Sequence, residues 1–101
     1  MDIRKLREAD LPALAALYKQ FKGDDSSLES MRATFARIAD SPDYAVLVAE
    51  VEGRLAGSAM GIVCAELYGQ CRPFLVIEDV IVDADHRRLG VGTALMNALE
   101  D

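Results

Sequence analysis

The chain opens with a short alternating segment that is followed by a helical pattern. Residues 2–6 alternate between polar and apolar, which indicates a short edge strand. Apolar residues then recur at helical spacing over 11–21, with Asp10 placed to cap the helix and Pro12 in its first turn. Gly23 marks the end of this helix. We therefore expect one strand and one helix here.

A second helix is expected to begin at Ser26. Ser26 and Glu29 have the spacing of a capping box, in which each side chain accepts a hydrogen bond from the backbone N–H of the other residue. The apolar face of this helix is formed by Leu28, Met31, Phe35 and Ile38. Pro42 ends the helix, because proline cannot continue it.

The pattern then changes to that of strands. Residues 44–51 form a β-branched and apolar run, 52–53 are a tight-turn pair, and 55–67 are a second apolar run, so an antiparallel hairpin is expected. A loop over 68–73 leads to a third strand at 74–82. This strand is apolar on both faces apart from two acidic residues, which is typical of a strand at the centre of a sheet.

A last helix is expected from Gly92 to the end of the chain at Glu100 and Asp101. Its end has no glycine cap and no basic last turn, and two carboxylates beside the negative end of a helix dipole are unfavourable. We therefore expect a single domain over 1–101 that is truncated within this helix. A natural, frayed end is the alternative.

Composition and charge exclude several classes of function. The chain has 17 Asp and Glu against 11 Lys and Arg, a net charge of -6, which argues against nucleic acid because phosphates need a basic surface. It shows no signal-peptide core and no apolar run near the roughly 20 residues of a membrane helix, so we expect a soluble, cytoplasmic protein without a membrane partner. Cys64, Cys71 and His86 do not cluster as metal ligands, so we expect reduced thiols and no metal.

The residues that most clearly indicate a ligand-binding site surround a glycine-containing turn. The third strand ends at Val82, and Arg87-x-x-Gly90-x-Gly92 then leads into the last helix. The glycines let the backbone approach a ligand closely, and the first free N–H groups of the helix point at one spot. With Arg87 and Arg88, such a turn can hold a phosphate or pyrophosphate. The spacing fits neither a Walker loop nor a dinucleotide fold, and a plain strand-to-helix turn is the alternative.

The order of these elements, together with the turn, resembles the GCN5-related N-acetyltransferase (GNAT) superfamily. The resemblance covers essentially the whole chain as β-α-α-β-β-β-α, and it is sharpest over 77–96 (IEDVIVDADHRRLGVGTALM) and the hairpin at 48–57 (VAEVEGRLAG). It implies an α/β fold with a mixed, mostly antiparallel sheet that lacks the C-terminal strands and helix of the family. It also implies an acetyl-CoA-dependent N-acetyltransferase, in which an amine attacks the thioester directly.

By this resemblance, the turn and the strand before it would bind acetyl-CoA. The groups that would hold the pyrophosphate are Arg87, Gly90 and Gly92, with the amides of Arg88, Leu89, Val91, Thr93 and Ala94. The backbone at Ile81 and Val82 would pair with the pantetheine arm, and one of these N–H groups would polarise the thioester carbonyl. A tyrosine that commonly protonates the leaving thiolate has no match among Tyr18, Tyr44 and Tyr68.

Glu78 is the candidate general base, because a protonated amine must lose a proton before it attacks. It resembles an acidic residue that polyamine-type members of the family use at this place. Alternation along the strand puts Asp79 on the opposite face, where it is a tentative amine-binding carboxylate. The alternative for Glu78 is an arginine partner or solvent. His86 is expected to be an exposed loop residue.

Other functions fit the same residues. A non-catalytic CoA-binding or protein-interaction module would keep the turn without turnover, and a generic phosphate-binding domain would bind ATP or NAD as well. The acceptor, a small-molecule or peptide amine, is not identified. Residues 22–28, with Asp24 and Asp25, either line its opening or form a solvated loop, which we favour. The strand at 74–82 would be left with an unpaired edge, which predicts a homodimer through strand pairing or exchange.

Overall fold

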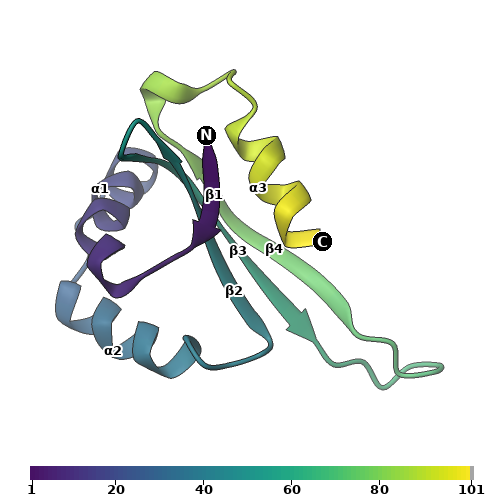
Figure 1. Ribbon diagram of the computed structural model, residues 1–101. Helices are drawn as coiled ribbons and strands as arrows, with labels where there is room; N and C mark the ends of the chain where they lie inside the picture. Colours follow the sequence, from purple (N-terminus) through teal and green to yellow (C-terminus); the bar gives the residue numbers. More distant parts are fainter. Residues whose placement is uncertain (101) are drawn as a thin grey trace.

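The computed structural model describes residues 1–100, which form a four-stranded sheet with helices on both faces (Figure 1). The elements are β1 (Asp2–Lys5), α1 (Leu11–Lys22), α2 (Leu28–Ile38), β2 (Tyr44–Val51), β3 (Arg54–Cys64), β4 (Phe74–Val82) and α3 (Val91–Glu100). The order across the sheet is β1-β2-β3-β4, and each neighbouring pair is antiparallel. The α/β class and the order of elements are confirmed, but the described part of the sheet is wholly antiparallel rather than mixed.

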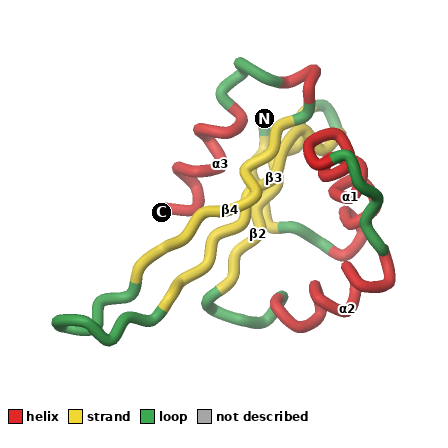
Figure 2. The backbone as a smooth tube through the Cα atoms, turned by 180° about the vertical axis from the view of Figure 1, so that it is seen from behind, coloured by secondary structure: helices red, strands yellow, loops and turns green. Residues whose placement is uncertain are grey.

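The sheet separates two apolar clusters. Helices α1 and α2 lie on one side of it and α3 lies on the other, as the two opposite views show (Figures 1 and 2). The buried residues on the first side are Leu11, Leu14, Leu17 and Ile81. The buried residues on the second side are Ala49, Ala59, Val91 and Leu95. β4 contributes side chains to both clusters, so it is packed against other elements on both of its faces.

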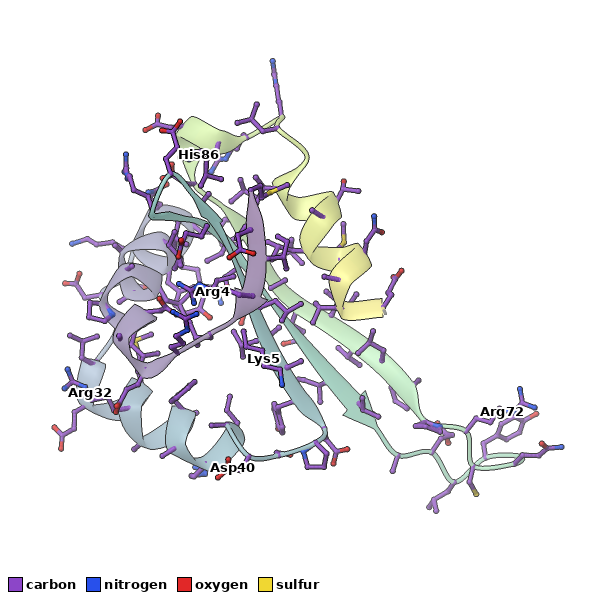
Figure 3. All side chains as sticks on the ribbon, in the orientation of Figure 1. Arg4, Lys5, Arg32, Asp40, Arg72 and His86 are labelled. Carbon is purple, nitrogen blue, oxygen red and sulfur yellow. The ribbon has the colours of Figure 1, made fainter. Side chains whose placement is uncertain are left out.

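The start of α1 differs from the predicted cap. Asp10 precedes the helix, but its carboxylate makes no capping bond to it. The carboxylate instead accepts hydrogen bonds from Arg4 Nη1 at 2.7 Å and Nη2 at 2.9 Å, and from the Arg7 N–H at 2.8 Å. The bond from Arg4 is the main reason that the pKa of Asp10 is lowered. Figure 3 shows Arg4 beside the start of this helix, where it ties β1 to the segment that follows.

The cap of the second helix lies one residue later than predicted. Ser27 caps α2, and its hydroxyl accepts a hydrogen bond from the Ser30 N–H at 3.2 Å. The predicted capping box between Ser26 and Glu29 is therefore wrong.

The end of α1 is as predicted. Gly23 adopts a left-handed φ of 84°, and its N–H donates a hydrogen bond to Lys19 O, which confirms that the helix stops here.

Strands β3 and β4 continue beyond the rest of the sheet, and residues 65–73 form the tip that joins them (Figure 1). β3 ends at Cys64 rather than at 67. The tip carries exposed apolar side chains, among them Leu67 and Tyr68.

β4 lies at an edge of the sheet. Within residues 1–100, no strand pairs with the outer side of β4. The expectation of a central strand is therefore wrong for this part of the chain, and the expected unpaired edge is confirmed.

No helix in this part of the chain is long and apolar enough to cross a membrane. Asp101, which contributed to the expectation of a truncated helix, lies outside the described residues.

Candidate functional site

The turn between β4 and α3 contains most of the residues that the sequence associates with a cofactor. A short helical turn at Ala84–His86 follows β4, and the chain then passes through Arg88 and Gly90, which have positive φ angles of 70° and 79°. Glycine adopts this conformation without steric cost, whereas arginine rarely does. The backbone here follows a path that a regular strand or helix does not allow.

This turn surrounds a depression of about 300 Å³. Its lining consists of Val82, Arg87, Arg88, Gly90, Val91, Gly92, Thr93 and Met96. The sequence singled out each of these residues except Met96. Met96 lies four residues after Gly92, so the spacing of residues on one helix face would have found it. Leu89 is 63% exposed and is not part of the lining.

The first turn of α3 directs free N–H groups toward the depression. The first N–H groups of any helix have no partner within it, and here they belong to Val91, Gly92 and Thr93. The Ala94 N–H, which the sequence had assigned to the same task, instead donates to Gly90 O at 2.9 Å. Arg87 and Arg88 are exposed beside this helix end. Because the helix dipole and both arginines favour negative charge, the residues present fit a phosphate group.

A buried carboxylate fixes the start of the turn to α1. Asp83 is 7% exposed, and its Oδ1 accepts a hydrogen bond from Gln20 Nε2 at 2.8 Å. Its Oδ2 lies 2.7 Å from His86 Nδ1, and Gln20 Oε1 accepts from the Ala84 N–H at 3.2 Å. The hydrogen bond from Gln20 is the main reason that the pKa of Asp83 is lowered, and the one with His86 is the second. The prediction that His86 is an exposed loop residue is wrong, because its side chain is 16% exposed and lies against Asp83.

A bulge in β4 changes the direction of the two acidic side chains. Glu78 pairs with Met60 and Ile81 pairs with Ser58, so one residue of β3 faces two residues of β4. Asp79, at the bulge, has a φ of 51°. Residues directly opposite each other in antiparallel strands share a face, so Glu78 faces the same side as Met60, the side of α1 and α2.

Asp79 faces that side as well, because its carboxylate contacts α1. Asp79 Oδ1 lies 3.1 Å from Lys22 Nζ, and Lys22 Nζ is 6.0 Å from the centroid of the Tyr18 ring. Burial and, secondarily, the charge of Asp79 raise the pKa of Tyr18. The prediction that Glu78 and Asp79 face opposite sides is therefore wrong. Glu78 is exposed and forms no ion pair with any residue in 1–100.

Two adjoining cavities open beside Asp79. A polar cavity of about 240 Å³ is lined by Tyr18, Lys22, Asp24, Asp25, Ser26 and Asp79. Part of the segment at 22–28 thus lines a cavity, although Asp24 and Asp25 remain exposed. A groove of about 400 Å³ lies between α1, α2 and the sheet, and Tyr18, Ser26 and Asp79 belong to its lining too. The sequence included Lys22 only as the first residue of the segment at 22–28, and it assigned Tyr18 no role at a site.

The two cysteines form no disulfide within residues 1–100. Cys64 is half-buried and Cys71 exposed, and both are free thiols. Within residues 1–100, no three His, Cys, Asp or Glu side chains are arranged to hold a metal ion.

The sequence matches one protein family, and the fold is similar to those of several solved structures. Residues 11–101 match the family model described as "Acetyltransferase (GNAT) family". Glucosamine-6-phosphate N-acetyltransferase from Arabidopsis thaliana is similar in structure, with 27% identity and a TM-score of 0.90, over 99% of this chain and 71% of that one. An acetyltransferase from Trypanosoma brucei shares 27% identity with a TM-score of 0.77, over 97% and 70% of the two chains.

A third solved structure shows the same fold at lower identity. This aminoglycoside acetyltransferase from an uncultured soil metagenomic sample, in complex with trehalose, is 24% identical with a TM-score of 0.76, over 98% of this chain and 66% of that one. Among curated protein sequences, none matches the chain.

Proposed function

Because the chain belongs to the GNAT family of acetyltransferases, we propose that it binds acetyl-CoA and takes part in moving the acetyl group to a primary amine. One observation carries this proposal. The turn with two positive-φ residues and the start of α3 follow the end of β4, and two carboxylates on β4 face the α1 and α2 side. The groups that would bind a phosphate-bearing donor therefore follow directly after the strand whose carboxylates would bind an amine acceptor.

The residues around the turn would hold the cofactor. The free N–H groups of Val91, Gly92 and Thr93, with the guanidinium groups of Arg87 and Arg88, would bind its pyrophosphate. Alternate residues of an edge strand direct their N–H groups away from the paired neighbour, so one of the N–H groups of 81–82 faces the free edge, where it would meet the pantetheine arm. Acetyl-CoA supplies the thioester from which the acetyl group is transferred.

The two carboxylates would act on the acceptor. An amine is protonated near neutral pH, and Asp79 would bind it in that form through an ion pair. Glu78, which is exposed on the same side of the strand, would accept the proton directly or through a water molecule, leaving a neutral nitrogen that can attack. Because the bulge puts both groups on one side, they can serve the same amine.

A calorimetric titration with acetyl-CoA tests the cofactor site, with ATP as the control ligand. We expect selective binding of acetyl-CoA and a loss of about tenfold or more in the Arg87→Ala variant, since charge-assisted hydrogen bonds to phosphate are strong. Arg72→Ala is the matched control, because Arg72 is an exposed arginine on the tip at 65–73 (Figure 3). Equal binding of ATP would favour a generic phosphate-binding domain, and no binding by folded protein would contradict the proposal.

Turnover separates an enzyme from a non-catalytic CoA-binding module. Release of free CoA from acetyl-CoA is measured with a panel of primary amines. We expect Glu78→Gln to lower kcat/KM by about 10²-fold or more while acetyl-CoA binding stays unchanged, because only proton removal is affected. If the chain binds acetyl-CoA but no amine stimulates release, the non-catalytic alternative replaces the enzyme.

The free edge of β4 also supports self-association through strand pairing. A homodimer formed this way would use the same edge as the pantetheine arm, so the two would compete. Sedimentation velocity should then show a dimer that acetyl-CoA dissociates. A monomer at all concentrations would contradict this part of the proposal.

A further inference from the structure

Asp79 and Tyr18 already hold an alkylammonium group. Lys22 Nζ lies 3.1 Å from Asp79 Oδ1 and 6.0 Å from the centroid of the Tyr18 ring. A carboxylate and an aromatic face are the two chemical groups that recognise ammonium most directly. The Lys22 side chain is 54% exposed, and an exposed ion pair contributes little stability, so another ammonium group can replace it easily.

An apolar groove begins at the same place. It has a volume of about 400 Å³, and its apolar lining includes Leu11, Leu14, Met31, Phe35 and Met60. Tyr18 and Asp79 line both this groove and the polar cavity that contains Lys22, so the two adjoin at these residues. Among the residues of 1–100 that line the groove, Asp79 alone is charged. The groove therefore offers one anionic end and an otherwise neutral, largely apolar wall.

We propose that the acceptor is a primary monoamine with an apolar body. Its ammonium group replaces Lys22 between Asp79 and Tyr18, and its body lies in the groove. Charge complementarity favours one cation at the Asp79 end, whereas a second cation placed along the apolar wall would lose its hydration without a partner. This inference rests on the proposed function, because it names the class of amine that the enzyme acetylates.

Binding of amines in the absence of acetyl-CoA tests this inference. The ¹⁵N-labelled chain is titrated with hexylamine, hexan-1-ol and 1,6-diaminohexane, and the dissociation constants are taken from amide chemical shifts. We expect hexylamine to bind at least about tenfold more tightly than the alcohol, which lacks the charge. It should also bind more tightly than the diamine, and each methylene removed from it should weaken binding roughly three- to fourfold.

Variants of two lysines on α1 test the site of binding. Lys22→Ala removes the competing ammonium and should tighten hexylamine binding several-fold. Lys19→Ala is the matched control, because Lys19 pairs with Asp25 at 2.9 Å and makes no ion pair with Asp79 among the described residues. Asp79→Asn should weaken binding at least about tenfold, and asparagine tolerates the left-handed backbone at this position, so the fold should be retained.

Three results would overturn the inference: equal affinities for hexylamine and hexan-1-ol, tighter binding of the diamine, or identical behaviour of the two lysine variants. These results differ from a failure of the proposed function. A chain that binds hexylamine but never acetylates it would reject the enzyme and retain the site. A chain that acetylates 1,6-diaminohexane in preference to hexylamine would retain the enzyme and reject this acceptor class.

Discussion

Replacement of Gly57 by alanine should weaken the packing of α3 on the sheet. Gly57 faces α3 from β3, and a Cβ atom added to it would lie 2.8 Å from Val91 Cγ1, 2.9 Å from Ile81 O and 3.3 Å from Leu95 Cδ1. Val91 and Leu95 are buried, and the Ile81 carbonyl belongs to the neighbouring strand, whose pairing with β3 fixes its position. The beginning of α3 would therefore have to move away from the sheet.

The size of the effect follows from these distances. Val91 must move back by about 0.6 Å, from 2.8 Å to the 3.4 Å at which ordinary contact begins. Inserting a methyl group into a packed core typically costs about 1–3 kcal/mol. Alanine offsets about 0.4–1 kcal/mol of this by restricting the unfolded chain. We expect Gly57→Ala to lower the free energy of unfolding by about 1–2 kcal/mol.

Urea unfolding followed by far-UV circular dichroism measures this change, since the chain has no tryptophan for fluorescence. Gly61→Ala should lose less stability, because its closest contacts, at 3.0 Å and 3.3 Å, are the flexible ends of leucine side chains. Gly92→Ala is the matched control. Its Cβ would make ordinary contacts at 3.7 Å and 3.8 Å, and alanine favours the helix, so stability should rise slightly. The reasoning fails if Gly57→Ala is as stable as the wild type or if Gly92→Ala loses as much.

Two further predictions concern a buried carboxylate and a half-buried ion pair. The lowered pKa of Asp83, caused first by Gln20, means that this carboxylate contributes stability above its unfolded pKa of about 3.9, and that the contribution disappears as the pH falls through the lower folded value. The difference in unfolding free energy between wild type and Asp83→Asn should therefore be larger at pH 7 than at pH 3, and a constant difference would contradict this. Arg4→Met should cost about 1–3 kcal/mol, and Asp10→Asn should then cost less than it does alone; additive losses in this double-mutant cycle would show that the two residues are not coupled.

Local patterns predicted the regular elements well. β4 has the predicted bounds because its apolar run lies between Pro73 and the polar turn that begins at Asp83. The cap of α1 was assigned wrongly because the partner of Asp10 lies on β1: the carboxylate accepts hydrogen bonds from Arg4 and none from the N–H groups of α1. Ser26 and Ser27 are both serines and are equally suited to cap a helix. Which of them caps α2 therefore depends on the backbone path between Gly23 and the helix.

The turn of the candidate site was predictable for the same reason. Its glycines and arginines are close together in the sequence, and their spacing describes a single local structure. The partners of β4 on α1 were not predictable, because Gln20 is 63 residues from Asp83 and Lys22 is 57 residues from Asp79. These contacts form only after α1 packs against the sheet.

The bulge at Asp79 is the feature on which the proposed chemistry depends most. In a regular strand, the residues at 80 and 82 would face α3, and so would Glu78. The extra residue at the bulge turns Glu78 to the side of α1, while Val80 and Val82 still pack against α3. The sequence alone does not indicate this change of side, because valine and isoleucine are apolar whichever face of the sheet each of them occupies. The proposed base and the proposed ammonium-binding carboxylate therefore lie on one side of the sheet only because β4 is irregular at this position.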